Sequence, residues 1–468
     1  MKPYFPTQIS FRAIIVYLVS LALISIIYFS YAMKFGYFVL GIIWVLGFFL
    51  LTSRWSKGWR SVASRDYLES IIIIALILRL IWVISSYYFF IEATGIPFEF
   101  ETADALSYHD VAKWLADEKW SVAWKYFFGA GAEGISDVGY PMYLTILYKL
   151  FGPVIIIPRI LKVFLSTLTC VLVYKLSART FNEGVGRIAG IMCALMPNLI
   201  IYCGFHLKET EMIFLEVAFI ERLDYLVRNK NYHFTTVLIP SLLAGSLFFF
   251  RTVLGLAAVF AFVTAILFTV TPSMGGRTKR VFLIGWGVFC IAIVSGGTAM
   301  TEVEALWEQK DTNMERKRTE QTLRGNLWAK YATGTVMAPL SLVLPFATMV
   351  DVDQQYEQQM KSGGNYIRNF MGFFAILAIY EAIRRKKLRE YAIIGSLTLA
   401  YIGAVSLSGF SNSERFLLPG LPGLIMMWAY GVSVLRKETF RFLTPWCFIV
   451  LVMEIGWAYF KLGSRGLL

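Results

Sequence analysis

Charged residues are scarce in this chain. Asp, Glu, Lys and Arg make up 16% of its 468 residues, whereas hydrophobic residues make up 57% and the mean hydropathy is +0.61. A soluble domain usually carries about 25% charged residues. The shortage of charge therefore excludes an ordinary soluble globular protein.

Cysteine and histidine are also few. The five cysteines, Cys170, Cys193, Cys203, Cys290 and Cys447, lie inside apolar runs and form no CxxC pair. The three histidines form no HExxH motif and no cluster with cysteine. The cysteines are expected to be small buried side chains. Neither the cysteines nor the histidines have the spacing of a zinc site.

Long apolar runs are abundant, and each is long enough for a helix across roughly 30 Å of hydrocarbon. The short alternating strands of a membrane β-barrel are absent from the pattern. The N-terminal MKPYFPTQISFR shows no small-residue cleavage site, so we expect a retained first helix. The fold class expected is an all-α polytopic membrane protein with about 13 spans (11 to 13). The spans are 11–33, 35–52, 70–91, 158–177, 187–204, 209–227, 234–250, 252–270, 281–299, 367–383, 391–408, 416–435 and 442–460.

The short connections between spans are basic, and an excess of Lys and Arg is typical of cytoplasmic loops. They are SRWSKGWRSVASR (53–65), ARTFNEGVGR (178–187), RNKNYH (228–233), GGRTKR (275–280), RRKKLR (384–389) and RKETFR (436–441). Alternation of the thirteen spans then places the N-terminus in the cytoplasm and the C-terminus outside.

Two apolar segments are too short or too interrupted to count as spans. GYPMYLTILYKLFG (139–152) would invert every later loop if it crossed, so we expect a helix that lies in the outer interface or dips in and returns. The same argument applies to VMAPLSLVLPFATMV (336–350), which prolines break.

The chain divides into two expected domains. Residues 1–69 form an N-terminal two-helix membrane hairpin with a basic cytoplasmic loop. Residues 70–468 form the main transmembrane domain, with outer loops at about 92–157 and 300–366.

The first outer loop is acidic although the chain carries a net charge of +13. Between 92 and 137 it holds nine acids and three lysines, and FEFETADALSYHDVA (98–112) is its densest part. A positive-inside bias tolerates acids outside. The other interpretation is a site that holds a proton, a metal ion or both, because paired carboxylates serve as general bases and as ligands of hard cations.

Helical spacing runs from Ala103 to Trp120 and predicts a helix lying on the membrane. Asp104 and Tyr108 are i and i+4, so they share a face. Asp110 is expected on the wetter side of this helix. His109 is expected to be solvated or a capping residue, and a proton relay is the alternative.

Basic residues stand at the other outer membrane edges: Lys208 beside Glu209, Arg251, Arg415 and Arg159. A single such residue is usually a snorkelling anchor. Four on the face that carries the acidic loop predict a polar cleft for an anionic lipid head, because Arg and Lys pair well with phosphate.

Several motifs in order resemble the GT-C superfamily of membrane glycosyltransferases, in the branch of protein O-mannosyltransferases and the lipid A aminoarabinose transferase. They are DALSYHDVA, VGYPMYLTILYKLFG, the long run from PRILKVF to KETEMIFLEV, and SERFLLPGLPGL. The matching residues are Asp104, the LFG at 150–152, Arg159, SARTFNEGVGR at 177–187, Glu209, Arg415, Phe416, Pro419 and Pro422. The likeness covers residues 90 to 435. The chain departs from the pattern at Val138, where relatives carry a lysine.

The resemblance implies an inverting hexosyl- or pentosyltransferase that uses a polyprenyl-phosphate sugar in the outer leaflet. Asp104 would be the catalytic base. Arg415, Arg251, Lys208 and Arg159 would bind the donor phosphate. Asp137, Glu209 and Tyr108 would orient the acceptor or a divalent ion. Glu99 and Glu101 would lie around the site or in water.

The same resemblance leaves a divalent cation, Mg²⁺ or Mn²⁺, held by Asp104 and Glu209, as an open alternative. The acceptor would be a glycan, a lipid or a protein, and no nucleic-acid partner is expected. The location implied is a bacterial inner membrane with the active site facing outside.

Two other functions compete with this one. A polymerase or ligase of lipid-linked glycans would use the late outer loop and would not depend on Asp104. A transporter or flippase would place charges deep within spans, and few ionisable residues lie there, among them Arg79, Glu216 and Glu454.

Overall fold

The computed structural model describes residues 3–129, 134–229, 234–269, 340–353, 355–407 and 413–468. The described chain is helical, and its one β-bridge joins Ala32 to Val350. The expected all-α class is confirmed for this part of the chain.

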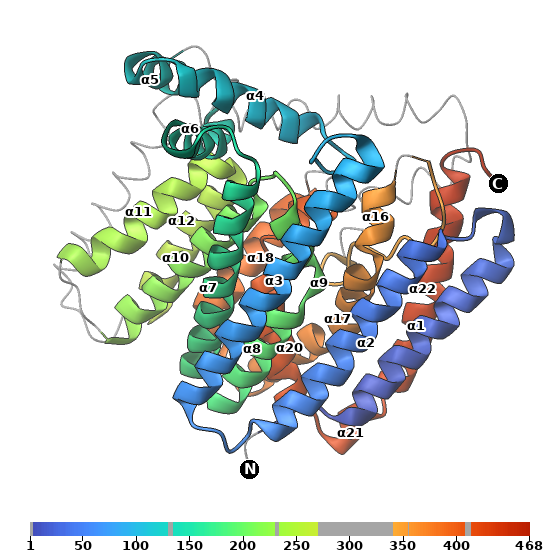
Figure 1. Cartoon of the computed structure of the whole chain (residues 1–468). Helices are drawn as coiled ribbons and strands as arrows, with labels where there is room; N and C mark the ends of the chain where they lie inside the picture. The colour runs from blue at the N-terminus through green and yellow to red at the C-terminus, as the bar shows by residue number, and fades with distance from the viewer. Residues whose placement is uncertain (1–2, 130–133, 230–233, 270–339, 354, 408–412) are drawn as a thin grey trace.

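The α-helices follow one another with short connections (Figure 1). Their bounds are α1 Thr7–Ile27, α2 Phe35–Gly58, α3 Ser64–Thr94, α4 Ala103–Asp117, α5 Trp120–Phe128, α6 Gly139–Phe151, α7 Ile156–Thr180, α8 Glu183–Leu195, α9 Pro197–Ile201, α10 Glu209–Asn229, α11 Phe234–Phe250, α12 Thr252–Thr269, α16 Tyr356–Met360, α17 Ser362–Arg384, α18 Leu388–Leu407, α19 Glu414–Leu417, α20 Leu421–Ser433, α21 Lys437–Phe440 and α22 Leu443–Gly463. Three short 3₁₀ helices are η1 Phe29–Tyr31, η2 Ile135–Asp137 and η3 Tyr202–Gly204.

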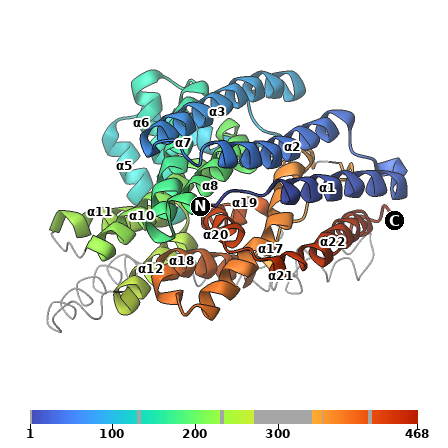
Figure 2. The same ribbon diagram turned by 90° about the horizontal axis from the view of Figure 1, so that it is seen from below.

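Helices α8 and α20 form the centre of the bundle (Figure 2). Nearly every residue of both is buried, so neither has the polar face of a surface helix. Helix α7 packs on α8, and α17 packs on α20. On one side lie α1, α2 and α22, and on the other lie α10, α11 and α12 (Figure 2).

Seven described helices are long and apolar enough to cross a membrane, or eight if the bent pair α8–α9 counts as one span. The seven are α1, α2, α3, α7, α17, α18 and α22 with α21 before it. These helices characterise the chain as a multi-pass membrane protein.

Twelve of the thirteen expected spans fall on described helices, and the span expected at 281–299 lies outside the described residues. Helices α11, α12 and α20 are apolar but shorter than the seven, and α10 carries several charged residues. The number thirteen therefore stays a prediction.

The span expected at 187–204 is broken. Helix α8 ends at Leu195, and the chain bends by 52° before continuing through α9 and η3. Pro197 causes the break, because proline removes a backbone donor and clashes with the preceding turn. The bend brings Asn198 and Tyr202 toward the candidate site described below.

Helices α4, α5 and α6 lie together at one end of the bundle, and α4 and α5 run across the long helices (Figure 1). Helix α6 covers almost the whole segment for which an interfacial helix was expected, and it packs on α4. Lys149 strengthens that contact by donating to the carbonyls of Ala116, at 2.9 Å, and Glu118. The first and last described residues lie at opposite ends of the bundle (Figure 1).

The expectation of an interfacial helix at 336–350 is wrong for its described part. Residues 340–350 form irregular chain that is buried from Val343 onward. Asn369 satisfies this backbone by donating to the carbonyls of Val343, at 2.6 Å, and Pro345, at 2.8 Å. Irregular backbone within a membrane bundle needs such partners, because no water is available there.

The expected N-terminal hairpin packs against the rest of the bundle. Helix α1 contacts α2 and α22, and α2 contacts α8 and α17. The division into domains at residue 69 stays a prediction. The outer segment from 300 to 339 lies outside the described residues.

Candidate functional site

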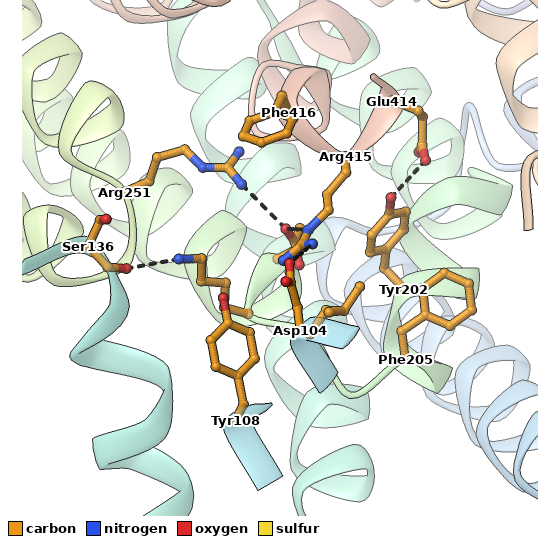
Figure 3. A network of polar contacts seen from close by, with 12 residues as sticks. Asp104, Tyr108, Ser136, Tyr202, Phe205, Arg251, Glu414, Arg415 and Phe416 are labelled. Carbon is orange, nitrogen blue, oxygen red and sulfur yellow. Dashed lines mark hydrogen bonds and ion pairs between the residues drawn. The ribbon is translucent and has the colours of Figure 1, made fainter. Parts of the chain in front are cut away.

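The candidate site lies where the start of α4 meets the end of the bundle (Figure 3). Its side chains come from separate parts of the chain. Asp104 and Tyr108 belong to α4, Asp137 to η2, Lys208 and Glu209 to the start of α10, Arg251 to the break between α11 and α12, and Arg415 to α19. Seven of the eight residues that the sequence singled out are thus brought together.

Arg415 is the centre of the network. Its Nη1 donates to Oδ2 of Asp104, 311 positions away, and its Nε donates to Oε1 of Glu209 at 2.6 Å. Asp104 lies in the first turn of α4 and Glu209 in the first turn of α10, where a carboxylate is favoured by the positive end of the helix dipole. Burial alone would lower the pKa of Arg415, but Glu209, Tyr108 and Asp104 outweigh it and raise that pKa.

Arg251 approaches Glu209 from the opposite side. Its Nη2 lies 3.4 Å from Oε1 of Glu209, and its Nη1 donates to the hydroxyl of Tyr401 at 3.0 Å. Its guanidinium also stacks over the ring of Phe416, 4.6 Å from the centroid. Glu209 is fully buried, and its Oε2 has no hydrogen-bond partner in the described part of the chain. Arg415 and Arg251 thus share one oxygen of a fully buried carboxylate.

Lys208, Asp137 and Tyr108 form the outer edge of the site. Lys208 Nζ donates to Oδ1 of Asp137 at 2.9 Å and to the carbonyl of Ser136 at 2.8 Å. Tyr108 donates to the same Asp137 oxygen at 3.4 Å. Burial raises the pKa of Tyr108, and Asp137 raises it further, so the phenol stays a neutral donor. Burial lowers the pKa of Lys208 although Asp137 opposes this effect.

The arrangement does not fit the divalent cation that the sequence left open. Asp104 and Oε1 of Glu209 both face the guanidinium of Arg415, which occupies the position between them. Within the described ranges, no group of three or more His, Cys, Asp or Glu side chains is placed to hold a metal ion. The chemistry below therefore uses side chains alone.

Arg159 is not part of this network, so the expectation that all four cations would gather is wrong for this residue. Arg159 is fully buried on α7, with Nη2 donating to the carbonyl of Pro97 and lying 3.7 Å from Oε2 of Glu99. Glu99 is equally buried, which corrects the expectation that it would lie in water or beside the site. Burial raises the pKa of Glu99, although Arg159 opposes this.

His109 is neither solvated nor a capping residue. It is half-buried, and its Nδ1 lies 2.8 Å from the hydroxyl of Tyr148. That hydroxyl in turn lies 3.3 Å from Nε2 of His206. Burial lowers the pKa of both histidines, so both stay neutral near pH 7. Asp110 is exposed, as expected.

A second polar cluster, which the sequence did not predict, lies directly behind Arg415. Glu414 accepts a hydrogen bond from Tyr202 at 2.8 Å (Figure 3). It also accepts a hydrogen bond from Asn198 at 2.6 Å and pairs with Lys361 at 3.1 Å. Glu414 and Arg415 are neighbours on α19, where successive side chains point about 100° apart. The adjacent opposite charges of Glu414 and Arg415 in SERF (413–416) were the sequence signal that could have predicted this cluster.

Of the three ionisable residues singled out within spans, Arg79 is held by several hydrogen bonds. The Arg79 guanidinium is fully buried and donates to the Ser166 hydroxyl at 2.7 Å and to the carbonyls of Ala194 and Cys193 at 3.1 and 3.2 Å. Such contacts give Arg79 a structural role between α3, α7 and α8. Glu216 and Glu454 are buried too.

The fold and the site together define a class: a multi-pass helical membrane protein with a charged network of acids and bases at one end of its bundle. No known family model matches the chain, and no curated protein matches it significantly. The function is therefore inferred from the residues of this chain.

Proposed function

We propose that this protein is an integral membrane glycosyltransferase. It moves a sugar from a polyprenyl-phosphate donor to an acceptor on the outer face of the membrane and inverts the anomeric centre. The resemblance to the GT-C superfamily supports this proposal, and so does the network around Arg415.

The observation that carries the proposal is the convergence of three carboxylates and three cations. Asp104, Glu209 and Asp137 pair with Arg415, Arg251 and Lys208, and Arg415 and Arg251 share Glu209. Two guanidiniums and an ammonium beside one another suit the phosphate diester of the donor and the phosphate monoester that leaves. A half-exposed carboxylate next to them suits a base that meets an acceptor from outside.

Each side chain then has a role in a one-step displacement. The acceptor hydroxyl gives its proton to Asp104 while its oxygen attacks the anomeric carbon. The bond between that carbon and the phosphate oxygen breaks, and its electron pair leaves with the polyprenyl phosphate. Arg415, Arg251 and Lys208 stabilise the charge that gathers on the leaving phosphate.

The remaining groups position the acceptor. Tyr108 stays protonated and donates, and Asp137 accepts. The basic connections support a site on the outer side, and we propose a bacterial inner membrane as the location.

The test is transfer by the purified protein. Full-length protein in liposomes is incubated with a panel of polyprenyl-phosphate sugars and a membrane extract, and released polyprenyl phosphate is measured by mass spectrometry. Asp104→Asn should slow release by about 10²- to 10⁴-fold, the usual contribution of a general base. Asp110→Asn, on the exposed face of the same helix, is the matched control and should not.

Three results would contradict the proposal. Equal turnover by Asp104→Asn and wild type would remove Asp104 as the base. Release from lipid diphosphates alone would favour a polymerase or ligase. No release from any monophosphate donor would remove the glycosyltransferase assignment.

A further inference from the structure

The guanidinium of Arg415 holds the two carboxylates to which the proposed reaction gives different tasks. Nη1 donates to Asp104 and Nε donates to Glu209. An oxygen of Asp104 that accepts a hydrogen bond from Arg415 is not free to take a proton from an acceptor. In the arrangement described, the phosphate-binding cation therefore occupies Oδ2, one of the two oxygens of the base.

The two ends of this bridge are unequal. The Glu209 side chain is fully buried, and Arg251 gives it a second cationic partner at 3.4 Å. The side chain of Asp104 is 52% exposed. Water can replace Arg415 at Asp104, whereas leaving Glu209 would uncover a buried charge. Asp104 is thus the end that a competitor displaces.

The shape of the guanidinium points to the same end. A phosphate bound in bidentate fashion takes two parallel N–H groups on one edge of the fork. One such edge is made by Nη1 and Nη2. Nη1 is the nitrogen that contacts Asp104, whereas Nε, which contacts Glu209, is not part of this edge. A phosphate on this edge removes Arg415 from Asp104 without disturbing Glu209.

We propose that Arg415 is a latch that frees Asp104 only when the phosphate of the lipid donor binds. This inference rests on the proposed function and adds an order of events to it. The donor phosphate binds Arg415, Asp104 is released, and the acceptor then loses its proton to the free carboxylate. Without a donor, the carboxylate stays paired with Arg415.

The test measures how reactive Asp104 is. Full-length protein in detergent is treated with a water-soluble carbodiimide and an amine, and modification of each carboxylate is quantified by peptide mass spectrometry. Farnesyl phosphate is the probe, and its binding is followed separately by thermal shift. In wild type, saturating probe should raise Asp104 modification about fivefold. A half-exposed ion pair is worth up to about 1 kcal/mol, which corresponds to about a fivefold ratio between paired and unpaired Asp104. Modification of exposed Asp110 should not change.

Variants separate the latch from simple binding. Arg415→Ala should show high Asp104 modification without probe and no further rise. Arg415→Lys, whose ammonium is a single point charge, should hold Asp104 less well and give an intermediate level. Inorganic phosphate at equal concentration shows whether the lipid chain is needed for the response.

Each failure has a distinct meaning. If farnesyl phosphate binds wild type and Asp104 modification stays constant or falls, the latch is wrong. Absence of binding also overturns it, as does low Asp104 modification in a folded Arg415→Ala protein. If the probe raises Asp104 modification but no polyprenyl-phosphate sugar is used, the latch stands and the glycosyltransferase proposal fails.

Discussion

Arg159 and Arg415 show how differently two arginines at helix ends can be used. Both stand before apolar spans in the sequence, and both were expected to bind phosphate. Arg415 is partly exposed and reaches an exposed carboxylate, whereas Arg159 and Glu99 are both fully buried. Local sequence cannot distinguish them, because the partners lie at least 60 positions away along the chain.

The first prediction follows from that burial. Arg159→Met should strongly destabilise the protein by about 3–5 kcal/mol, because it leaves Glu99 buried and uncompensated. The double variant Arg159→Met with Glu99→Gln should recover much of the loss. Thermal unfolding in detergent measures this cycle. If Arg159→Met is as stable as wild type but no longer binds the donor, Arg159 instead belongs to the phosphate-binding site.

A second residue makes stability depend on pH. Burial raises the pKa of Glu357 from 4.5 to about 7, and Lys361 lowers it only in part. Glu357 Oε1 accepts from the backbone N–H of Glu101 at 2.8 Å. Because the folded-state pKa is raised, the contribution to stability is complete below about pH 4.5 and is lost as pH rises through 7.

The difference between pH 4.5 and pH 8 should be about 3 kcal/mol for this group, an order-of-magnitude figure. Melting temperatures measured between pH 5 and pH 8 should fall with rising pH in wild type. Glu357→Gln keeps an oxygen for the Glu101 N–H and should flatten this slope. A variant with the wild-type slope would show that another group titrates.

At the scale of helices, the sequence predicted well where the long helices lie, but it predicted poorly where a helix is broken or replaced by irregular chain. Apolar runs located α1, α2, α3 and α7 because lipid-facing helices need continuous apolar residues. The bend at Pro197 and the buried irregular chain at 340–350 depend on partners such as Asn369, which lies in another helix. The cluster of acids was recognisable, and the basic loops predicted that it shares a membrane face with Glu209 and Arg415, but the ion pair between Asp104 and Arg415 was not predicted.

The closest helix contact near the site gives a third prediction. A Cβ at Gly364 of α17 would lie 1.6 Å from Oδ1 of Asn198. Gly364→Ala should therefore displace Asn198, which holds Glu414 beside Arg415. We expect a lower melting temperature and weaker donor binding. Gly395→Ala, where nothing lies within 4 Å, is the matched control and should stabilise α18 by up to about 1 kcal/mol.

At the scale of the whole molecule, the two ends of the bundle differ in chemistry. One end carries α4, α5 and α6 with the acid–base network, and the opposite end carries connections such as the one between α2 and α3 (Figure 1). The excess of Lys and Arg in these connections predicts that they face the cytoplasm. The site then faces outside, where a lipid-linked donor and an extracytoplasmic acceptor can meet.

This orientation is the last prediction, and two exposed serines report on it. Ser107 lies on α4 and Ser61 lies between α2 and α3, and both side chains are exposed. In intact bacterial cells, a membrane-impermeant maleimide should label Ser107→Cys, and it should label Ser61→Cys only after the inner membrane is opened. Unmodified protein corrects for the native cysteines, of which Cys170, Cys193 and Cys203 are buried. The reverse labelling pattern would show that the site faces the cytoplasm. Its donor would then have to be a cytoplasmic one, and the proposed function would be wrong.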